Sequence, residues 1–382
     1  MAEKTLAQTL AALRKKDSDL RVGSLADFDM NVKAFSTGNL SLDSATGIGG
    51  LPRGRVIELF GVSQSGKTTA ALGTAATHQK RVLAGLDEGA ILYLDYEYSL
   101  DENYCATLGL DVNDASTFIY VQPDNLEQGA QIFRDLTKAG HLAFGIVDSV
   151  AAMATKKEIE AVSGSVSVGE RAKLITQLLR TSKGMLHRTQ SSLILVNHIL
   201  DYIETGPSYS RVKKTYTPGG SGIAFYSDMR IQFMIGTSVG AKQLNSVTQE
   251  EENIQTAANI RAKVTKNKVA LPQRLAHMQV RFGKGFSQPY SAYHAVKAHR
   301  GIKVTQTGGR HTIPADLSPT GEETLIVKTE NVIRLLETDS ETLDKWVAKA
   351  KELIDNWTDD KVTDDVDFNP DIDPDTGEVR DD

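Results

Sequence analysis

A glycine-rich stretch near the start of the chain has the spacing of a phosphate-binding loop. Residues 61–69 read GVSQSGKTT and fit the pattern Gly-x-x-x-x-Gly-Lys-Ser/Thr. An apolar strand-like segment precedes the loop and a helical pattern follows it, which is the setting in which backbone N–H groups hold phosphates. The pattern predicts a nucleotide site with Mg²⁺ bound by Thr68, and Lys67 placed to reach the β and γ phosphates. Its expected nucleotide-binding residues are Gly61, Ser65, Gly66, Lys67, Thr68 and Thr69.

Two other strand-like segments end in carboxylates that could serve the same nucleotide. Asp148 ends the apolar run AFGIVD, where a carboxylate can bind the metal directly or through water. Glu97 follows the run LYLD and is the candidate base that orients or deprotonates water. A simple cap at Asp148 and a solvated strand end at Glu97 are the alternatives.

The stretch KVTKNKV, residues 263–269, places two lysines far from the loop in sequence. In a strand, Lys266 and Lys268 share one face and lie roughly 6 to 7 Å apart. Two adjacent ammonium groups favour an anion, although a solvated edge strand has the same pattern.

The segments around these residues alternate between short apolar strands and helical patterns. Strand-like runs occur at 55–61, 90–95, 118–122, 143–149, 192–198 and 229–235. They predict an α/β fold with a mainly parallel sheet. Long Gly/Ser/Pro-rich loops interrupt this rhythm at 161–169 and 201–222, and amphipathic helices are expected at 3–16 and 340–357.

Charge is distributed unevenly over the 382 residues, whose net charge is −6. Residues 359–382 hold ten Asp and one Glu against one Lys and one Arg, so this tail carries −9 and the remainder +3. We expect this acidic tail to be disordered, either as a solubilising end or as a polyanion that competes with DNA for the protein's basic surface. The single cysteine, Cys105, and the lack of a signal-like or membrane-spanning run predict a cytoplasmic protein.

Several segments together resemble the bacterial RecA recombinases in order and spacing. They are STGNLSLDSATGIGGLPRGRVIELFGVSQSGKTT (36–69), LYLDYEYSLDENYCATLGLD (92–111), VDSVAAM (147–153), KKEIE (156–160), TPGGSGIAFYSDMR (217–230) and KVTKNKVALP (263–272). The likeness extends over roughly residues 20–290 and implies a RecA-like P-loop NTPase core. It implies four parts: an N-terminal helix and strand for protomer docking (1–35), the ATPase core with two DNA-binding loops (36–287), a small α+β C-terminal domain (288–357) and the acidic tail (358–382).

The resemblance also assigns roles to individual residues. It implies that Glu97 activates the attacking water and that Tyr104 stacks on adenine beside Asp101. Asn197 and His198 stand where the family has Asn-Gln, so Asn197 is expected to bind the cofactor and His198 to sense the γ-phosphate and couple it to DNA. Lys266 and Lys268 correspond to lysines that reach the γ-phosphate held by the neighbouring protomer. The residues implied to contact DNA are Val168, Gly169, Lys173, Thr176, Arg180, Arg211, Lys213, Lys214, Gly219, Gly220 and Ser221.

The sequence departs from the bacterial pattern at three places. His198 replaces the family's glutamine, Val168 replaces a methionine, and the segment 237–260 is longer than usual. The imidazole predicts a pH-dependent coupling of ATP to DNA. This divergence favours a bacteriophage-encoded protein that acts in the cytoplasm of a bacterial or phage-infected cell.

These observations favour an ATP- and Mg²⁺-dependent recombinase that polymerises on single-stranded DNA and exchanges strands with a homologous duplex. Expected partners are both forms of DNA, further copies of the chain in head-to-tail filaments or rings, and single-strand-binding and mediator proteins. The alternatives are a RecA-fold ring helicase or DNA motor, and a P-loop kinase or nucleotide-binding regulator without DNA activity.

Overall fold

The computed structural model describes residues 5–16, 22–24, 26, 31–161, 169–201, 215–244, 251–304 and 309–356. The chain divides into two units, residues 1–33 and 34–382. In the first unit, the predicted N-terminal helix is present as α1 (Leu6–Lys16). Residues 22–24, the described part of the segment directly after this helix, form no strand.

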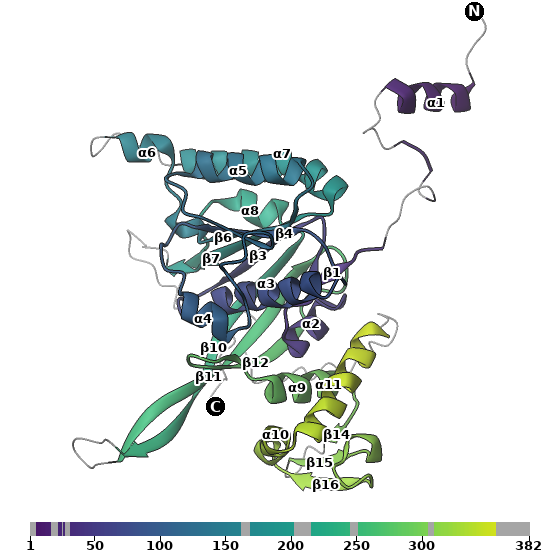
Figure 1. Ribbon diagram of the computed structural model, residues 1–382, viewed down its shortest axis with the longest axis vertical. Coiled ribbons are helices and arrows are strands. Elements are labelled where there is room, and N and C mark those ends of the chain that lie inside the picture. The colour runs from purple at the N-terminus through teal and green to yellow at the C-terminus, as the bar shows by residue number, and fades with distance from the viewer. Residues whose placement is uncertain are drawn as a thin grey trace, which may run out of the picture. The chain divides into compact units, whose positions relative to one another are not determined.

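One large sheet organises the second unit (Figure 1). In the described part of the chain its strands, in spatial order, are β13 (Gly285–Phe286), β12 (Leu275–Arg281), β11 (Glu251–Asn267), β10 (Met229–Leu244), β3 (Val56–Gly61), β7 (Ser192–His198), β6 (Leu142–Asp148), β4 (Ala90–Asp95) and β5 (Phe118–Val121). Neighbours from β10 to β5 are parallel, whereas those from β10 to β13 are antiparallel. The predicted α/β fold with a mainly parallel sheet is confirmed.

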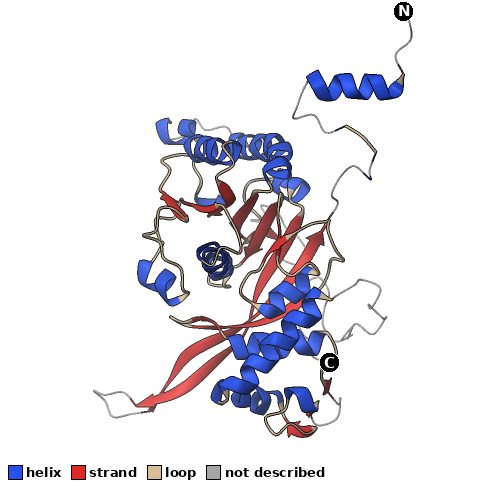
Figure 2. Cartoon of the chain, turned by 45° about the vertical axis from the view of Figure 1, so that its right-hand side comes forward, coloured by secondary structure: helices blue, strands red, loops and turns tan. Residues whose placement is uncertain are grey.

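Helices cover both faces of this sheet (Figures 1 and 2). One face packs against α2 (Leu40–Thr46), α3 (Lys67–Leu83) and α4 (Glu102–Thr107), and the other against α5 (Leu126–Lys138), α7 (Glu170–Thr189) and α8 (Ser221–Tyr226). The central strands read as continuous apolar runs because both of their faces are buried. Short elements connect them: β1 (Ala34–Phe35), β2 (Leu51–Pro52), η2 (Val150–Ala152), α6 (Lys156–Glu160), β8 (Leu200–Asp201) and β9 (Thr215–Tyr216).

The C-terminal part of the second unit has its own apolar core. It consists of α9 (Gln288–Ala298), β14 (Lys303–Val304), β15 (Arg310–Ile313), η3 (Ala315–Leu317), β16 (Thr324–Val327), α10 (Thr329–Thr338) and α11 (Ser340–Asp355). Trp346 is fully buried there, and its indole N–H donates to the Leu317 carbonyl at 2.8 Å. Leu40 of α2 belongs to the same core, so a separate C-terminal domain stays a prediction.

The strands β10 and β11 form a long hairpin that projects beyond the rest of the sheet (Figures 1 and 2). β3 pairs with β10 over Met229–Phe233, and β12 pairs with β11 over Ala257–Lys263. Farther out, the two strands pair with each other as far as Leu244 and Glu251. In the described part of the segment 237–260, residues 237–244 and 251–256 therefore form a two-stranded ribbon.

A buried carboxylate fixes the turn that leads into α2. Asp43 is 3% exposed and accepts hydrogen bonds from the Ser36 hydroxyl at 2.6 Å and from the N–H and hydroxyl of Thr37 at 2.8 and 2.6 Å. Burial raises the pKa of Asp43 to about 6, although these hydrogen bonds act to lower it. The ionised form therefore costs folding free energy.

No helix in the described ranges is long and apolar enough to cross a membrane.

Candidate active site

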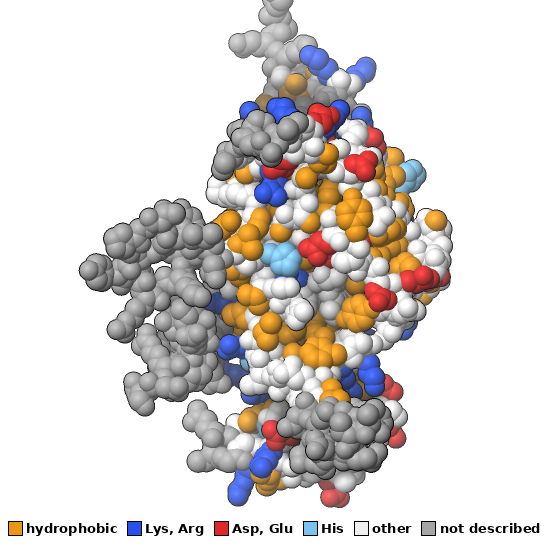
Figure 3. Space-filling view, turned by 90° about the vertical axis from the view of Figure 1, so that its left-hand side faces the viewer, with side chains coloured by type: hydrophobic (Ala, Val, Ile, Leu, Met, Phe, Trp, Pro, Cys, Tyr) orange, Lys and Arg blue, Asp and Glu red, His pale blue; other side chains and the backbone are white. Residues whose placement is uncertain are grey.

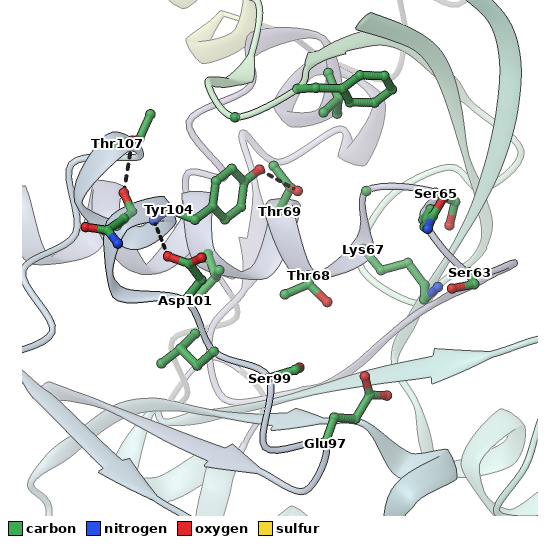
Figure 4. A pocket seen from close by; sticks show the side chains of 18 of the residues that line it. Ser63, Ser65, Lys67, Thr68, Thr69, Glu97, Ser99, Asp101, Tyr104 and Thr107 are labelled. Carbon is green, nitrogen blue, oxygen red and sulfur yellow. Dashed lines mark hydrogen bonds between the residues drawn. The ribbon is translucent and has the colours of Figure 1, made fainter. Parts of the chain in front are cut away.

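A pocket of about 790 Å³ lies where β3, β4 and β7 end (Figure 4). The loop after β3 contributes Ser63–Thr69, the segment after β4 contributes residues from Glu97 to Thr107, and β7 contributes His198. The turn between β12 and β13 closes another side with Phe282 and Gly283. Parallel sheets bind ligands at the carboxyl ends of their strands, because successive loops meet there.

The glycine-rich loop has the backbone that a phosphate site requires. Gly66 adopts φ +85°, which other residues rarely take, and a Cβ there would lie 2.8 Å from Ile260 Cδ1. A Cβ on Gly61 would lie 2.2 Å from the Phe233 carbonyl oxygen. Helix α3 begins directly after this turn, so the N–H groups of its first turn are placed to receive an anion.

Lys67 is a buried cation whose bonds in this structure are to neutral groups. Its side chain lies along the loop (Figure 4), and its ammonium donates to the carbonyls of Gly61 at 3.1 Å and Val62 at 2.7 Å. Burial lowers the pKa of Lys67, with partial compensation from Asp148 and Glu97. A phosphate would replace these neutral acceptors by a charged one, so the residue fits an anionic ligand.

Thr68 and Asp148 form a set of oxygen ligands. The Thr68 hydroxyl and the Tyr93 hydroxyl both donate to Asp148 Oδ2, each at 2.8 Å. Burial raises the pKa of Asp148, and the bonds from Tyr93 and Thr68 oppose that rise. Hydroxyl and carboxylate oxygens are the ligands that Mg²⁺ prefers. In the described ranges no cluster of three His, Cys, Asp or Glu could hold a metal ion.

Glu97 is held at the pocket by two partners. The Ser149 hydroxyl donates to its Oε1, and His198 Nε2 lies 3.2 Å from the same oxygen. The turn after β4 directs Glu97 here, because Asp95 accepts the N–H groups of Glu97 and Ser99, both at 3.1 Å. A carboxylate fixed in this way can orient a water molecule.

A second group of side chains occupies the far end of the pocket from Lys67 (Figure 4). Asp101 caps α4 by accepting the Tyr104 N–H at 2.9 Å, and the Tyr104 hydroxyl lies 2.9 Å from Thr69 Oγ1. Phe282 also lines the pocket and is 51% exposed. Two aromatic rings and a carboxylate form a surface that suits a planar base.

Asn197 does not reach this pocket. Its amide donates to Glu58 Oε1 at 2.9 Å and to the Pro218 carbonyl at 3.0 Å, and it is fully buried. Consecutive residues of a strand point to opposite faces, so only one of Asn197 and His198 can face the pocket. His198 is the one that does.

The described residues that are implied to contact DNA lie on α7 and at the start of α8. Lys173 and Arg180 are exposed on α7, whereas Thr176 is partly covered by α8, since a Cβ on Gly222 would lie 2.0 Å from its hydroxyl. Gly169 precedes α7, and Gly219, Gly220 and Ser221 lead into α8. Val168, Arg211, Lys213 and Lys214 lie outside the described residues.

The two lysines of β11 and its end are already engaged within the chain. Lys266 donates to the carbonyls of Ala224 at 2.6 Å and Phe225 at 3.0 Å, at the last turn of α8. Lys268 lies 3.5 Å from Asp228. Burial lowers the pKa of Lys266, and the nearby Lys268 lowers it further.

Two aromatic residues that line the pocket, Tyr93 and Phe282, and Ser149, which holds Glu97 from outside the lining, were not predicted from the sequence. Tyr93 reads as one more apolar strand residue, Ser149 only as the residue after Asp148, and Phe282 lies more than 200 positions after the glycine-rich loop. The signal for Ser149 was available, because it directly follows a candidate metal ligand at a strand end. Tyr93 and Phe282 become visible only when the strands are in place.

Comparisons with known proteins agree with this geometry. A family model described as the RecA N-terminal domain matches residues 4–287. Protein RecA of Aquifex aeolicus is 33% identical over 352 residues, which is 92% of each chain, and that of Aquifex pyrophilus is 36% identical over 284 residues, 74% of this chain and 75% of the relative. Protein RecA of Wolinella succinogenes is 38% identical over 257 residues, 67% of each chain. The chain belongs to the RecA family and is an ATP-dependent DNA recombinase with DNA-dependent ATPase activity.

Proposed function

We propose that ATP binds with its phosphates in the loop 61–69 and that this site drives recombination. The observation that carries the proposal is the convergence of Lys67, Thr68, Glu97 and His198, from three separate strand ends, on one pocket. Lys67 would bind the β and γ phosphates, and Thr68 and Asp148 would hold Mg²⁺. When bound, Mg²⁺ would offset the negative charge of the phosphates.

Glu97 is proposed to orient and deprotonate the attacking water. Its Oε1 accepts from Ser149 and lies 3.2 Å from His198, so the carboxylate is fixed while its other oxygen can meet water. The Asp101, Tyr104 and Phe282 group is proposed to hold the adenine by stacking and polar contact.

Single-stranded DNA is proposed to bind at the ends of α7 and α8. Exposed Lys173 and Arg180 would contact phosphates. Gly219 and Gly220, with φ of +92° and +78°, allow the turn into α8 to pack closely, because a Cβ there would lie 2.4 Å from Ile223 and 2.9 Å from Ala172. The loop residues Arg211, Lys213 and Lys214 would add charge.

Head-to-tail self-assembly completes the proposal. Lys266 and Lys268 would leave their own chain and bind the γ-phosphate in the neighbour's pocket, as an arginine finger does in other NTPases. The face of the molecule drawn in Figure 3 supports a protein-contact surface, because hydrophobic side chains are spread over its middle and few Lys or Arg lie there. Filaments of this kind need a heterologous interface that does not close.

The sequence differences from the bacterial relatives concern the origin of the chain. The identity of 33–38% to bacterial relatives and the histidine at position 198 support a bacteriophage-encoded protein acting in the cytoplasm of its host. Loading by single-strand-binding and mediator proteins is proposed with it.

The test is ATP hydrolysis with and without single-stranded DNA, followed by three-strand exchange. Glu97→Gln should lower the stimulated rate by about 10²- to 10⁴-fold while DNA and nucleotide still bind. Glu88→Gln, an exposed carboxylate outside the pocket, is the matched control and should act as wild type. Normal hydrolysis by Glu97→Gln would overturn its role, and DNA-stimulated hydrolysis without strand exchange would favour a helicase or motor.

A further inference from the structure

One carboxylate holds two lysines near the base of the β10–β11 hairpin. Asp228 Oδ1 lies 2.9 Å from the Lys183 ammonium and 3.5 Å from the Lys268 ammonium. The hairpin itself creates this arrangement, because the Lys268 N–H donates to the Asp228 carbonyl at 2.9 Å. Lys183 reaches the same carboxylate from α7.

The three side chains differ in how firmly they are fixed. The Asp228 side chain is 10% exposed, whereas the side chains of Lys183 and Lys268 are 33% and 47% exposed. The carboxylate is therefore the fixed member, and the more exposed Lys268 is the mobile one. Lys266 is bonded to the carbonyls of α8 instead, so Lys268 is the lysine of this pair that Asp228 holds.

We propose that Asp228 is a positioning residue that retains Lys268 in the unassembled chain and so sets the ATP concentration at which the assembled protein becomes active. This inference rests on the proposed reach of Lys268 to a phosphate bound by a second copy of the chain. Before Lys268 can make that contact, it must leave Asp228, and the phosphate competes with the carboxylate for one ammonium group.

Lys183 weakens this retention. It shares Oδ1 with Lys268 and lies closer to it, so part of the carboxylate charge is already neutralised when Lys268 approaches. Removing the Lys183 charge leaves Asp228 to Lys268 alone. Loss of the Asp228 charge and loss of the Lys183 charge should therefore change the required ATP concentration in opposite directions.

The experiment measures DNA-stimulated ATP hydrolysis against ATP concentration for two variants. Asp228→Asn keeps the shape and an oxygen that can accept the Val56 N–H, and should lower the half-saturating ATP concentration about two- to fivefold. Lys183→Met keeps the aliphatic stem and should raise it by a similar factor. The maximal rate should change little in both, because neither residue contacts the reacting groups.

Epistasis supplies the decisive control. Lys183→Met should have no effect on half-saturation once Asp228 is Asn, because Lys183 then has no charge to compete for. A merely structural role would move both single variants in the same direction, together with their melting temperatures, and that result would overturn the proposal. If Asp228→Asn does not fold, the Lys183→Met arm alone decides, and an unchanged or lowered half-saturation contradicts the idea.

Failure of the underlying function would look different. A fully active Lys268→Ala variant would show that Lys268 does not serve the phosphate at all. An inactive Lys268→Ala variant combined with unchanged half-saturation in Asp228→Asn and Lys183→Met would remove only the role of Asp228.

Discussion

The hydroxyl of Tyr93 should decide how well the pocket holds Mg²⁺. Tyr93→Phe leaves the ring in a core where the tyrosine is 2% exposed and removes one bond, the 2.8 Å donation to Asp148 Oδ2. A hydrogen bond to a charged group contributes about 1.5–3 kcal/mol, and loss of a partner behind a metal ligand commonly costs 10- to 100-fold in affinity. We therefore expect Mg²⁺-dependent nucleotide binding to weaken by about tenfold, which corresponds to about 1.4 kcal/mol.

The pH dependence of this effect has a definite sign. Burial already raises the pKa of Asp148, and the Tyr93 bond acts against that rise. In Tyr93→Phe the pKa of Asp148 should be higher still, so protons compete with Mg²⁺ more strongly. The affinity deficit should therefore grow as the pH falls.

Fluorescent ADP binding, titrated with Mg²⁺ at two pH values, measures both effects. Tyr120→Phe is the matched control, because it also removes a hydroxyl that donates to a carboxylate, here Asp95 at 3.0 Å. Asp95 holds the turn after β4 through backbone N–H groups and is not assigned to Mg²⁺. An unchanged Mg²⁺ midpoint in Tyr93→Phe would refute the reasoning, and so would an equal shift in the control variant.

Three further predictions concern stability. Burial raises the pKa of Asp43 from 3.8 to about 6, so its contribution to stability is present at low pH and is lost as the pH rises through about 6. The loss should reach up to about 3 kcal/mol. Thermal melts from pH 4 to 8 should show this slope in wild type and not in Asp43→Asn. Trp346→Phe, which leaves a cavity and an unpaired Leu317 carbonyl, should cost about 2–3 kcal/mol in denaturant titrations, and an unchanged midpoint would contradict the buried packing. Replacing residues 242–253 by Asn-Gly should alter stability by less than about 1 kcal/mol, as urea midpoints would show, since this outer ribbon pairs with no other strand of the described sheet.

The parts of the fold that could be predicted from the sequence are the strands that are buried on both faces of the sheet. β6 and β7 were found within one residue of their ends, because a strand buried on both faces is a continuous apolar run. The outer ribbon of β10 and β11 was not found, since it is solvated and its sequence, such as GTSVGAKQL, has neither an apolar run nor a regular alternation. Its strands are fixed by pairing with each other, which no local pattern records.

The site divides in the same way. The glycine-rich loop is a local motif, so its residues could be placed from spacing alone, and Asp148 and Glu97 followed from their positions at strand ends. Tyr93 and Phe282 could not, because their relation to the pocket depends on which strands are neighbours. Asn197 was grouped with His198 by resemblance, whereas the alternation of side chains along β7 separates the two.

That separation leads us to expect a link between the proposed DNA-binding loop and the phosphate end of the pocket. His198 meets Glu97 in the pocket, while Asn197, the preceding residue, bonds the Pro218 carbonyl where the second loop returns toward α8. No intervening residue lies between the two contacts, and the Glu58 bond pins Asn197 to the neighbouring strand β3. If DNA shifts this loop and moves the Pro218 carbonyl, we expect the Asn197 bond to weaken or break and the adjacent peptide to carry the change to His198. Because Glu97 is held by His198 and Ser149 at a single oxygen, a small rotation at position 198 should then change how the carboxylate meets water.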